Sequence, residues 1–145
     1  MCQRNNVRDR PRKDIIAYKV EIFERNRWRT PFELKVLHHD KELTAKGEED
    51  IYYNEIYGGF FHCYQKREKI SDYFGEKCRM VKVIIPAKDN VIYKGEFFDK
   101  PTICARRIIV TNEIIWVGER IKYLQEIITL EEEWNWKQQV SILKE

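Results

Sequence analysis

The stretch that decides the fold opens with Gly58-Gly59-Phe60-Phe61-His62-Cys63-Tyr64 and closes with Met80-Val81-Lys82-Val83-Ile84-Ile85-Pro86. Glycine tolerates a positive φ angle, so the glycine pair predicts a turn that leads into a strand over residues 60–64. The apolar run that stops at the proline predicts a further strand over residues 80–85. The centre of the chain is therefore expected to lie in a β-sheet.

Shorter elements are predicted between and after these two strands. Residues 66–74 suit a helix of about two turns that ends at a glycine. A turn at residues 87–90 leads into a strand over residues 91–94, which predicts a hairpin with the preceding strand. Apolar residues at 103–110 and 114–117 then predict one long strand or two short ones.

The segment before the glycine pair is expected to hold two strands and a long loop. Over residues 15–23 polar and apolar side chains alternate with the period of a strand, and Lys19 and Glu21 lie on the polar face. After a short turn, a second strand is predicted around residues 32–36. The charge-dense stretch over residues 38–50 predicts a surface loop.

From residue 119 onward the apolar period changes to that of a helix. An apolar stripe runs from Ile121 to Leu130 and continues to Trp134. We therefore expect an α+β fold: a single domain over residues 14–145 with a mainly antiparallel twisted sheet, a short internal helix and a longer C-terminal helix. Residues 1–13 carry almost no apolar side chains and are expected to form a flexible basic arm.

Composition excludes several classes of protein. A length of 145 residues is enough for one domain with its own core. No apolar run approaches the roughly 20 residues that span a bilayer, and no apolar h-region follows the N-terminal charges. We therefore expect a cytoplasmic protein that makes no membrane contact. The net charge of +3 is too small to indicate nucleic-acid binding by itself.

No catalytic or metal-binding motif of high specificity occurs in the sequence. Cys63, Cys78 and Cys104 lack the close spacing, roughly two to five residues, by which zinc ligands are recognised. His38-His39-Asp40 is the nearest approach to an acid–base pair, but it lies in a charged loop where solvation is the simpler interpretation. We expect no metal, no cofactor and no catalytic residue.

Basic and aromatic residues after the first strand form the main candidate binding site. Arg25, Arg27 and Arg29 surround Trp28, a combination that pairs with phosphates and stacks on bases. The basic arm adds further positive charge at the N-terminus. Nucleic acid or a phosphorylated ligand is therefore a candidate partner.

A second candidate surface lies in the predicted C-terminal helix. Trp134 and Trp136 are two positions apart, so one helix face cannot bury both. We expect one of them to contact a partner or a second subunit. A monomer and a homodimer both stay open.

The order of these elements resembles that of uncharacterised small proteins of phages and bacterial mobile elements. The similarity is carried by the glycine-aromatic-histidine strand at residues 58–64, the helix that ends Asp72-Tyr73-Phe74-Gly75, and the apolar strand before Pro86. It covers residues 15–117.

The same order also resembles, more remotely, ADP-ribosyltransferase-like domains, in which such a strand and a tyrosine-bearing helix frame a nicotinamide pocket. That resemblance implies Tyr73 near the nicotinamide ring, His62 on the neighbouring strand and Glu113 as the catalytic glutamate. Tyr18-Lys19 stands where those enzymes have the arginine or histidine that holds the dinucleotide. The family's dinucleotide-holding residue is therefore unmatched.

The leading hypothesis is a small non-enzymatic binding protein of phage or mobile-element type. It would act on a host protein or a nucleotide-like ligand, as an antagonist of host defence. The candidate ligand-binding residues are Arg25, Arg27, Trp28, Arg29, His62 and Tyr73. The alternatives are an ADP-ribosyltransferase-like enzyme that uses NAD and a nucleic-acid-binding accessory protein.

Overall fold

The computed structural model describes residues 3–31, 33–53, 55–68, 77–119 and 134. These residues are almost entirely β-sheet, with 64% in strands and 1% helical. The expected α+β class is therefore wrong for the described chain. The predicted internal helix over residues 66–74 fails where it can be read, because residues 66–68 are not helical. Its remainder and the C-terminal helix, apart from Trp134, fall outside the described residues.

The described chain contains eleven strands. They are β1 (Arg4–Asp9), β2 (Ile15–Glu24), β3 (Arg27–Arg29), β4 (Glu42–Thr44), β5 (Asp50–Tyr52), β6 (Glu55–Gly58), β7 (Phe61–Tyr64), β8 (Lys77–Ile85), β9 (Ile92–Phe97), β10 (Lys100–Ala105) and β11 (Arg107–Glu119). Many of these segments are rich in β-branched and aromatic residues, which pack well on a pleated surface. That preference accounts for the excess of strand over helix.

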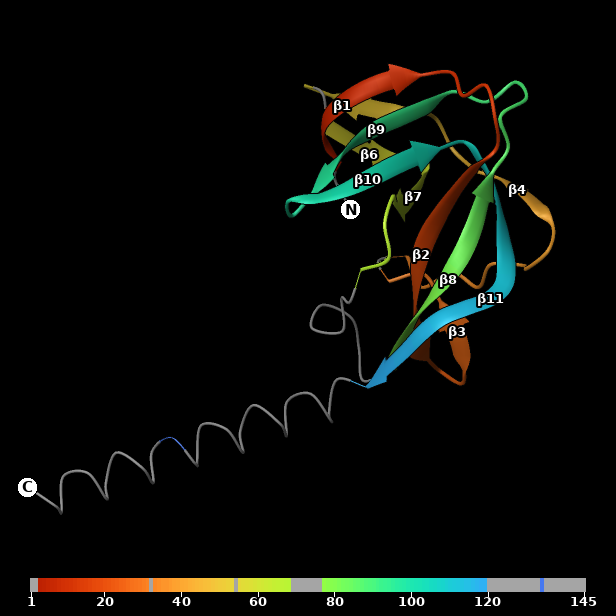
Figure 1. Ribbon diagram of the computed structural model, residues 1–145, viewed down its shortest axis with the longest axis vertical. Helices are drawn as coiled ribbons and strands as arrows, with labels where there is room; N and C mark the ends of the chain where they lie inside the picture. Colours follow the sequence, from red (N-terminus) through yellow and green to blue (C-terminus); the bar gives the residue numbers. More distant parts are fainter. Residues whose placement is uncertain (1–2, 32, 54, 69–76, 120–133, 135–145) are drawn as a thin grey trace, which may run out of the picture.

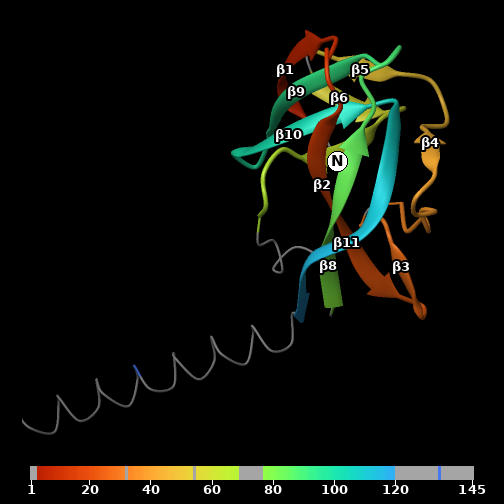
Figure 2. The same ribbon diagram turned by 45° about the vertical axis from the view of Figure 1, so that its right-hand side comes forward.

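Nine strands form one sheet in the order β1-β9-β10-β7-β2-β8-β11-β4, and β3 pairs with β2. The strand pairs are antiparallel, and β5 and β6 form a separate two-stranded sheet. Figures 1 and 2 show that the large sheet is strongly twisted, with β1, β9 and β10 in one half and β2, β8 and β11 in the other.

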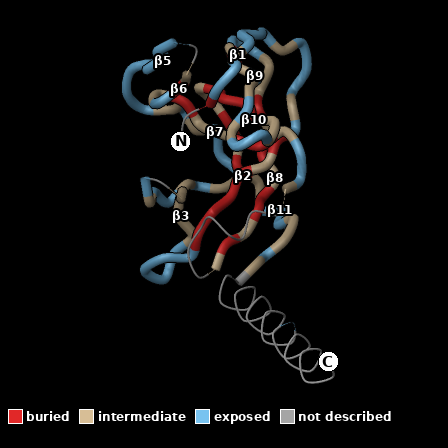
Figure 3. Tube along the Cα trace, turned by 90° about the vertical axis from the view of Figure 1, so that its left-hand side faces the viewer, coloured by how far each residue is buried: buried red, intermediate tan, exposed pale blue. Residues whose placement is uncertain are grey.

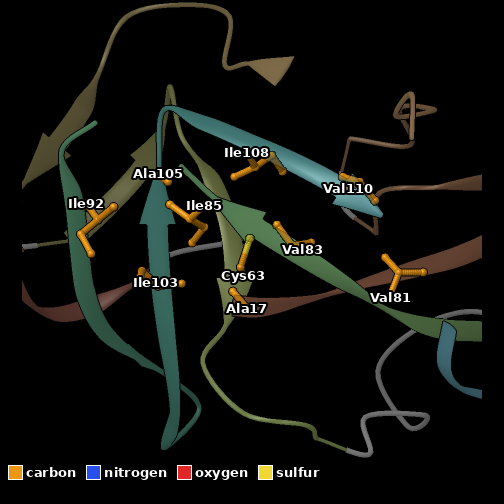
Figure 4. Packing of buried hydrophobic residues seen from close by; sticks show 10 residues of the cluster. All are labelled: Ala17, Cys63, Val81, Val83, Ile85, Ile92, Ile103, Ala105, Ile108 and Val110. Atoms are coloured by element: carbon orange, nitrogen blue, oxygen red, sulfur yellow. The ribbon is translucent and has the colours of Figure 1, made fainter. Parts of the chain in front are cut away.

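The hydrophobic core lies between these two halves of the sheet. Figure 4 shows ten buried side chains from six strands that point into the shared space: Ala17, Cys63, Val81, Val83, Ile85, Ile92, Ile103, Ala105, Ile108 and Val110. Burying a large aliphatic side chain contributes about 1.5–3 kcal/mol, so this cluster is the main source of stability. Figure 3 shows the buried positions concentrated along β2, β8 and β10.

Strand β2 is buried on both faces, although its sequence alternates like a half-exposed strand. Val20 and Ile22 pack in a second cluster on one face, together with Met80. The predicted polar face is buried as well, since Lys19 is 7% exposed and Glu21 is 1% exposed. Lys19 contacts the backbone of His62, and Glu21 is enclosed by Arg79 and His39.

Two local predictions in the first half are wrong, one of a strand and one of a loop. Residues 33–36 of the predicted strand are not in a strand, because the chain closes a tight loop in which Leu34 N–H donates to Thr30 O and Thr30 N–H donates to Lys35 O. Leu34 has a φ of 55°, which is incompatible with a strand. Residues 38–50, predicted as loop, include strand β4, which pairs with the edge of β11.

The predicted hairpin over residues 80–94 is also wrong. β8 lies between β2 and β11, whereas β9 lies between β1 and β10. The chain crosses between the halves after Pro86, and the Asn90 amide holds the crossing by donating to Pro86 O and Arg107 O. The long apolar strand β2 pairs with the edge of β8 that β9 would occupy in a hairpin.

Part of the predicted basic arm is a strand. β1 occupies residues 4–9 and pairs with β9 at the edge of the sheet. Gln3 is fully buried and accepts a hydrogen bond from Thr102 Oγ1 at 2.7 Å. In the part of the chain that the structure describes, no helix is long and apolar enough to cross a membrane.

Candidate functional site

The candidate site lies at an opening along one edge of β2. β8 covers the other edge of β2 from Ile15 to Ile22. On the open side, β7 pairs with β2 at Tyr18 and β3 pairs with it from Ile22 to Glu24. Among the described strands, none pairs with this edge at residues 19–21. The sheet therefore leaves a gap between β7 and β3.

A cavity of about 490 Å³ occupies this gap. Its walls are β2, the loop over residues 29–38, the segment over residues 43–46, and the turn from β6 into β7 over residues 57–64. Lys19 and Val20 both line the cavity although neighbouring strand residues point to opposite faces, because the cavity wraps around the strand edge. Its volume falls within the usual size of small-molecule sites.

Lys19 is a buried cation in the cavity wall. Its Nζ donates a hydrogen bond to His62 O at 3.0 Å. Among the described residues, no carboxylate lies within 4.0 Å of this ammonium group. Burying an ionised amine without a counter-charge is costly, so such groups are normally paired. The ammonium group of Lys19 is therefore available to pair with an anion.

Glu21, the nearest acid along the strand, is committed elsewhere. Its Oε1 accepts hydrogen bonds from Arg79 Nη2 at 2.8 Å and Nε at 3.0 Å, and lies 3.5 Å from His39 Nε2. His39 Nδ1 in turn lies 2.9 Å from Asn112 Oδ1. This network fixes the loop at residue 39 against the sheet and leaves Lys19 without its carboxylate.

His62 lines the cavity as a neutral imidazole. Burial, assisted by the positive charge of Lys19, lowers the pKa of His62 to about 3. Its Nδ1 lies 3.2 Å from Cys104 Sγ, and burial raises the pKa of the Cys104 thiol. A catalytic cysteine needs a lowered pKa and a nearby base that is basic enough to take up the thiol proton. This pair has the opposite character and is not prepared for nucleophilic attack.

Arg106 holds the cavity rim together. Its guanidinium Nη1 donates to Gly47 O at 3.1 Å and also to Gly59 O. Gly59 has a φ of 78°, and a Cβ atom there would lie 2.3 Å from Glu48 O. The β6–β7 turn therefore packs directly against the segment before β5. A glycine is required for this close approach.

Two of the predicted ligand-binding residues line the cavity. Arg29 and His62 are in its wall. Arg29 also pins the neighbouring loop, since its Nη1 donates to Leu34 O at 3.1 Å. Tyr73, the third residue predicted to share a pocket with His62, lies outside the described residues.

The other predicted ligand-binding residues lie away from the cavity. Arg25 and Arg27 are exposed at the β2–β3 turn, and neither lines the cavity. Trp28 packs its ring against the Arg79 guanidinium, whose carbon lies 4.3 Å from the ring centre. Figures 1 and 2 place β3 at the opposite end of the molecule from β1, so the two predicted basic regions do not form one surface.

The remaining predicted site residues are not brought to the cavity. Glu113 does not line it and forms an ion pair with Lys82 at 3.3 Å. Trp134 is helical and 61% exposed, as a partner-facing residue would be, whereas Trp136 lies outside the described residues. The transferase-type set of His62 and Glu113 is therefore not assembled in this cavity.

Sequence reasoning missed Lys19 as a site residue. The signal is a lysine in the middle of a strand that has apolar or aromatic neighbours, in Tyr18-Lys19-Val20. Alternation suggested a solvated face, because the sequence does not reveal that the sheet closes over it. Only a prediction of burial on both faces of β2 would have identified this residue.

Neither metal chemistry nor a known relative identifies the site. Among the described residues, no group of three or more His, Cys, Asp or Glu side chains could hold a metal ion. Comparison with protein-family models, curated proteins and solved structures found no match to this chain. The chemistry of the cavity is therefore inferred from its own residues.

Proposed function

We propose that the chain is a non-enzymatic binding protein whose cavity takes an anionic, nucleotide-like small molecule. The observation that carries this proposal is the ammonium group of Lys19, which is buried in the cavity wall without a carboxylate partner among the described residues. An anionic ligand supplies the missing counter-charge. Its binding offsets a cost that the unliganded fold bears.

The charge of the cavity lining supports the same ligand class. Arg29, Lys35 and Lys46 add positive charge to that of Lys19, and Glu33 is the one acidic side chain in the described lining. Glu33 is already paired with Lys35 at 3.0 Å. Positive charge in a low-dielectric cleft attracts anions and concentrates them near the site.

Aromatic side chains in the lining supply surface for a base. Tyr57, Phe60, Phe61 and Tyr64 all contribute to the wall. Phe60 is held by Tyr93, whose ring meets it edge to face with centres 5.5 Å apart. Ring stacking of a base on an aromatic side chain contributes about 1–3 kcal/mol.

A binding role rather than catalysis is favoured by the state of the two reactive side chains. His62 is neutral and the Cys104 thiol is protonated, both because of burial. Origin in a phage or mobile element, a cytoplasmic location and action against host defence stay predictions from the sequence. In that setting, a protein that captures a small anionic signal of its host needs no catalytic group.

Calorimetric titration tests the proposal directly. The probes are AMP, GMP and UMP, their 3′,5′-cyclic counterparts, and the uncharged nucleosides, each at pH 7.5. At least one anionic nucleotide should bind more tightly than its nucleoside, and Lys19→Met should abolish the difference. Lys94→Met is the matched control, because Lys94 is exposed on β9 and does not line the cavity. Equal binding by wild type and Lys19→Met would refute the proposal.

A second candidate is nucleic-acid binding at the β2–β3 turn. Arg25 and Arg27 are exposed there and have no acidic partner among the described residues. Phosphate contacts release counterions, so binding should weaken steeply as salt rises. The paired change Arg25→Gln with Arg27→Gln should reduce that salt slope for single-stranded DNA, whereas Arg8→Gln with Arg10→Gln should not. No binding at low salt would remove this candidate.

A further inference from the structure

The cavity has a buried floor and an exposed rim, and the two differ in charge. Lys19, Val20, Phe60 and Tyr64 are all at most 8% exposed and form the floor. Lys35, Val36, Lys46 and Tyr57 are exposed and form the rim. Water surrounds the positive charges on the rim and screens them. On the floor, positive charge is confined to Lys19. Arg29, which is half-buried in the wall, donates its Nε and Nη1 to Glu24 O and Leu34 O, so the neighbouring loop holds its guanidinium group.

The floor offers one cation for charge pairing. Next to Lys19 lies a neutral His62, and the other floor side chains are apolar or aromatic. Glu21 does not offset the charge of Lys19, because its carboxylate is paired with Arg79. A ligand group that reaches the floor is therefore neutralised by a single positive charge, at short range and away from water.

A group with two negative charges would leave one of them unpaired on this floor. An uncompensated buried charge is strongly unfavourable, whereas a matched pair with good hydrogen bonds is tolerated. Rim lysines compensate poorly, because solvent screens exposed charges. The floor is thus matched to a monoanion and mismatched to a dianion.

We propose that the cavity selects ligands whose inserted group is a monoanion, a phosphodiester or a carboxylate attached to an aromatic body, over phosphate-monoester dianions. This inference rests on the proposed function and names the ligand class for the same site. Lys19 is the selecting residue, since it supplies the single floor charge. The rim lysines and the aromatic wall accept the rest of the ligand.

The first test compares ligands that share a base but differ in charge. At pH 7.5, 3′,5′-cyclic AMP carries one phosphate charge and AMP carries nearly two, because the second pKa of a phosphate monoester is about 6. The cyclic nucleotide should bind at least about tenfold more tightly than AMP. The same order should hold for the guanine and uracil pairs, and Lys19→Met should remove it.

A pH series separates ligand charge from ligand shape. Between pH 7.5 and 5.5 AMP becomes a monoanion while cyclic AMP keeps one charge, so the affinity ratio should narrow towards one. Ionisable groups that face the cavity are Lys19, Arg29, Glu33, Lys35, His38, Lys46, Tyr57, His62 and Tyr64. A change in the charge of the site would act more strongly on a dianion than on a monoanion, so the series is repeated in His38→Gln, which removes the exposed histidine of the lining. Circular dichroism at each pH checks that the fold is retained.

A third probe, indole-3-acetate, distinguishes the two sources of a monoanion. Tight Lys19-dependent binding of this carboxylate, with weaker cyclic nucleotides, supports the inference and assigns a carboxylate ligand. The reverse order supports it and assigns a phosphodiester. AMP binding as tightly as cyclic AMP at pH 7.5, through Lys19, would overturn the selection while leaving the proposed function standing. Absence of any Lys19-dependent binding would remove both.

Discussion

At the scale of single residues, the central feature is the buried positive charge of Lys19, for which the unliganded fold supplies no counter-charge among the described residues. Lys19 donates one hydrogen bond, to His62 O, and is otherwise enclosed by the cavity wall. Residues retained for binding often reduce stability, because their partners are absent until the ligand arrives. Lys19 has the properties of such a residue.

Replacing Lys19 with methionine should therefore stabilise the unliganded protein. The change removes a buried charge and shortens the side chain by one atom, and losing the charged hydrogen bond to His62 O costs about 1.5–3 kcal/mol. We expect a net rise in the free energy of unfolding of about 1 kcal/mol or more, measured by urea denaturation at pH 7.5. The exposed control Lys94→Met should change it by less than about 0.5 kcal/mol. A clear loss of stability in Lys19→Met would mean that the ammonium group supports the fold.

His62 gives the protein a characteristic acid sensitivity. Its pKa falls from 6.5 to about 3 on folding, because burial and Lys19 disfavour the charged ring. Between these values the unfolded chain binds a proton that the folded chain does not, so stability falls as pH falls. The loss can reach about 1.4 kcal/mol per pH unit. His62→Gln should flatten this slope between pH 6.5 and 5, in urea titrations at each pH. Parallel slopes for the two proteins would contradict the assignment.

At the scale of elements, the β6–β7 turn sets the shape of the cavity. Gly59 and Gly47 both have positive φ angles, 78° and 86°, but their surroundings differ. A Cβ atom at Gly59 meets the backbone of Glu48 at 2.3 Å, whereas nothing lies within 4 Å of one at Gly47. Alanine substitutions at the two glycines therefore separate the free-energy cost of a positive φ angle from that of a steric clash.

Gly59→Ala should consequently destabilise the protein more than Gly47→Ala does. The positive φ angle alone costs about 1–2 kcal/mol in each variant, and the clash adds about 1–3 kcal/mol at Gly59. Thermal unfolding of both variants measures the difference. Gly59→Ala should also weaken nucleotide binding, because it displaces the turn that lines the cavity. Equal stabilities of the two variants would show that the turn moves away from the added Cβ atom without destabilising the protein.

The pairing of β1 with β9 depends on a second close approach. A Cβ atom at Gly95 would lie 2.5 Å from Arg4 O and 2.7 Å from the Gln3 side chain. Gly95→Ala should therefore push β1 off the sheet edge and raise amide hydrogen exchange over residues 3–9. Gly58→Ala is the control, since its Cβ would make an ordinary 3.7 Å contact with Asp50. Unchanged protection of the β1 amides from hydrogen exchange would show that β1 accommodates the added Cβ atom and stays paired with β9.

At the scale of the whole molecule, the sequence predicted strands better than their partners. Local patterns located β2, β7, β8 and β9, because each combines apolar or β-branched residues with a turn signal. The predicted partner of β8 was its neighbour in sequence, β9, yet β8 pairs with β2. Which distant strands pair depends on how all the strands compete for the free edges of the sheet. A short window of sequence carries no information about that competition.

The candidate site was predictable only in part, for the same reason. Arg29 was named from residue chemistry and His62 from the resemblance to ADP-ribosyltransferase-like domains, and both line the cavity. Lys19 was not, because its burial results from segments distant in sequence, among them the β6–β7 segment that carries His62. Charged residues in an alternating strand are usually solvated, and this strand departs from that pattern where it borders the cavity.

The pairing of β2 with β8 has a consequence for how the chain is made. β2 ends at Glu24, but its long partner is complete only at Ile85. Until residue 85 has been synthesised, β2 therefore lacks the full strand that pairs with its long edge. Topologies dominated by such distant pairings fold slowly, on the order of milliseconds to seconds. Nascent chains arrested before β8 emerges should be cut readily by protease, and those arrested well after β11 should resist. We therefore expect the chain to be most prone to aggregation during that interval.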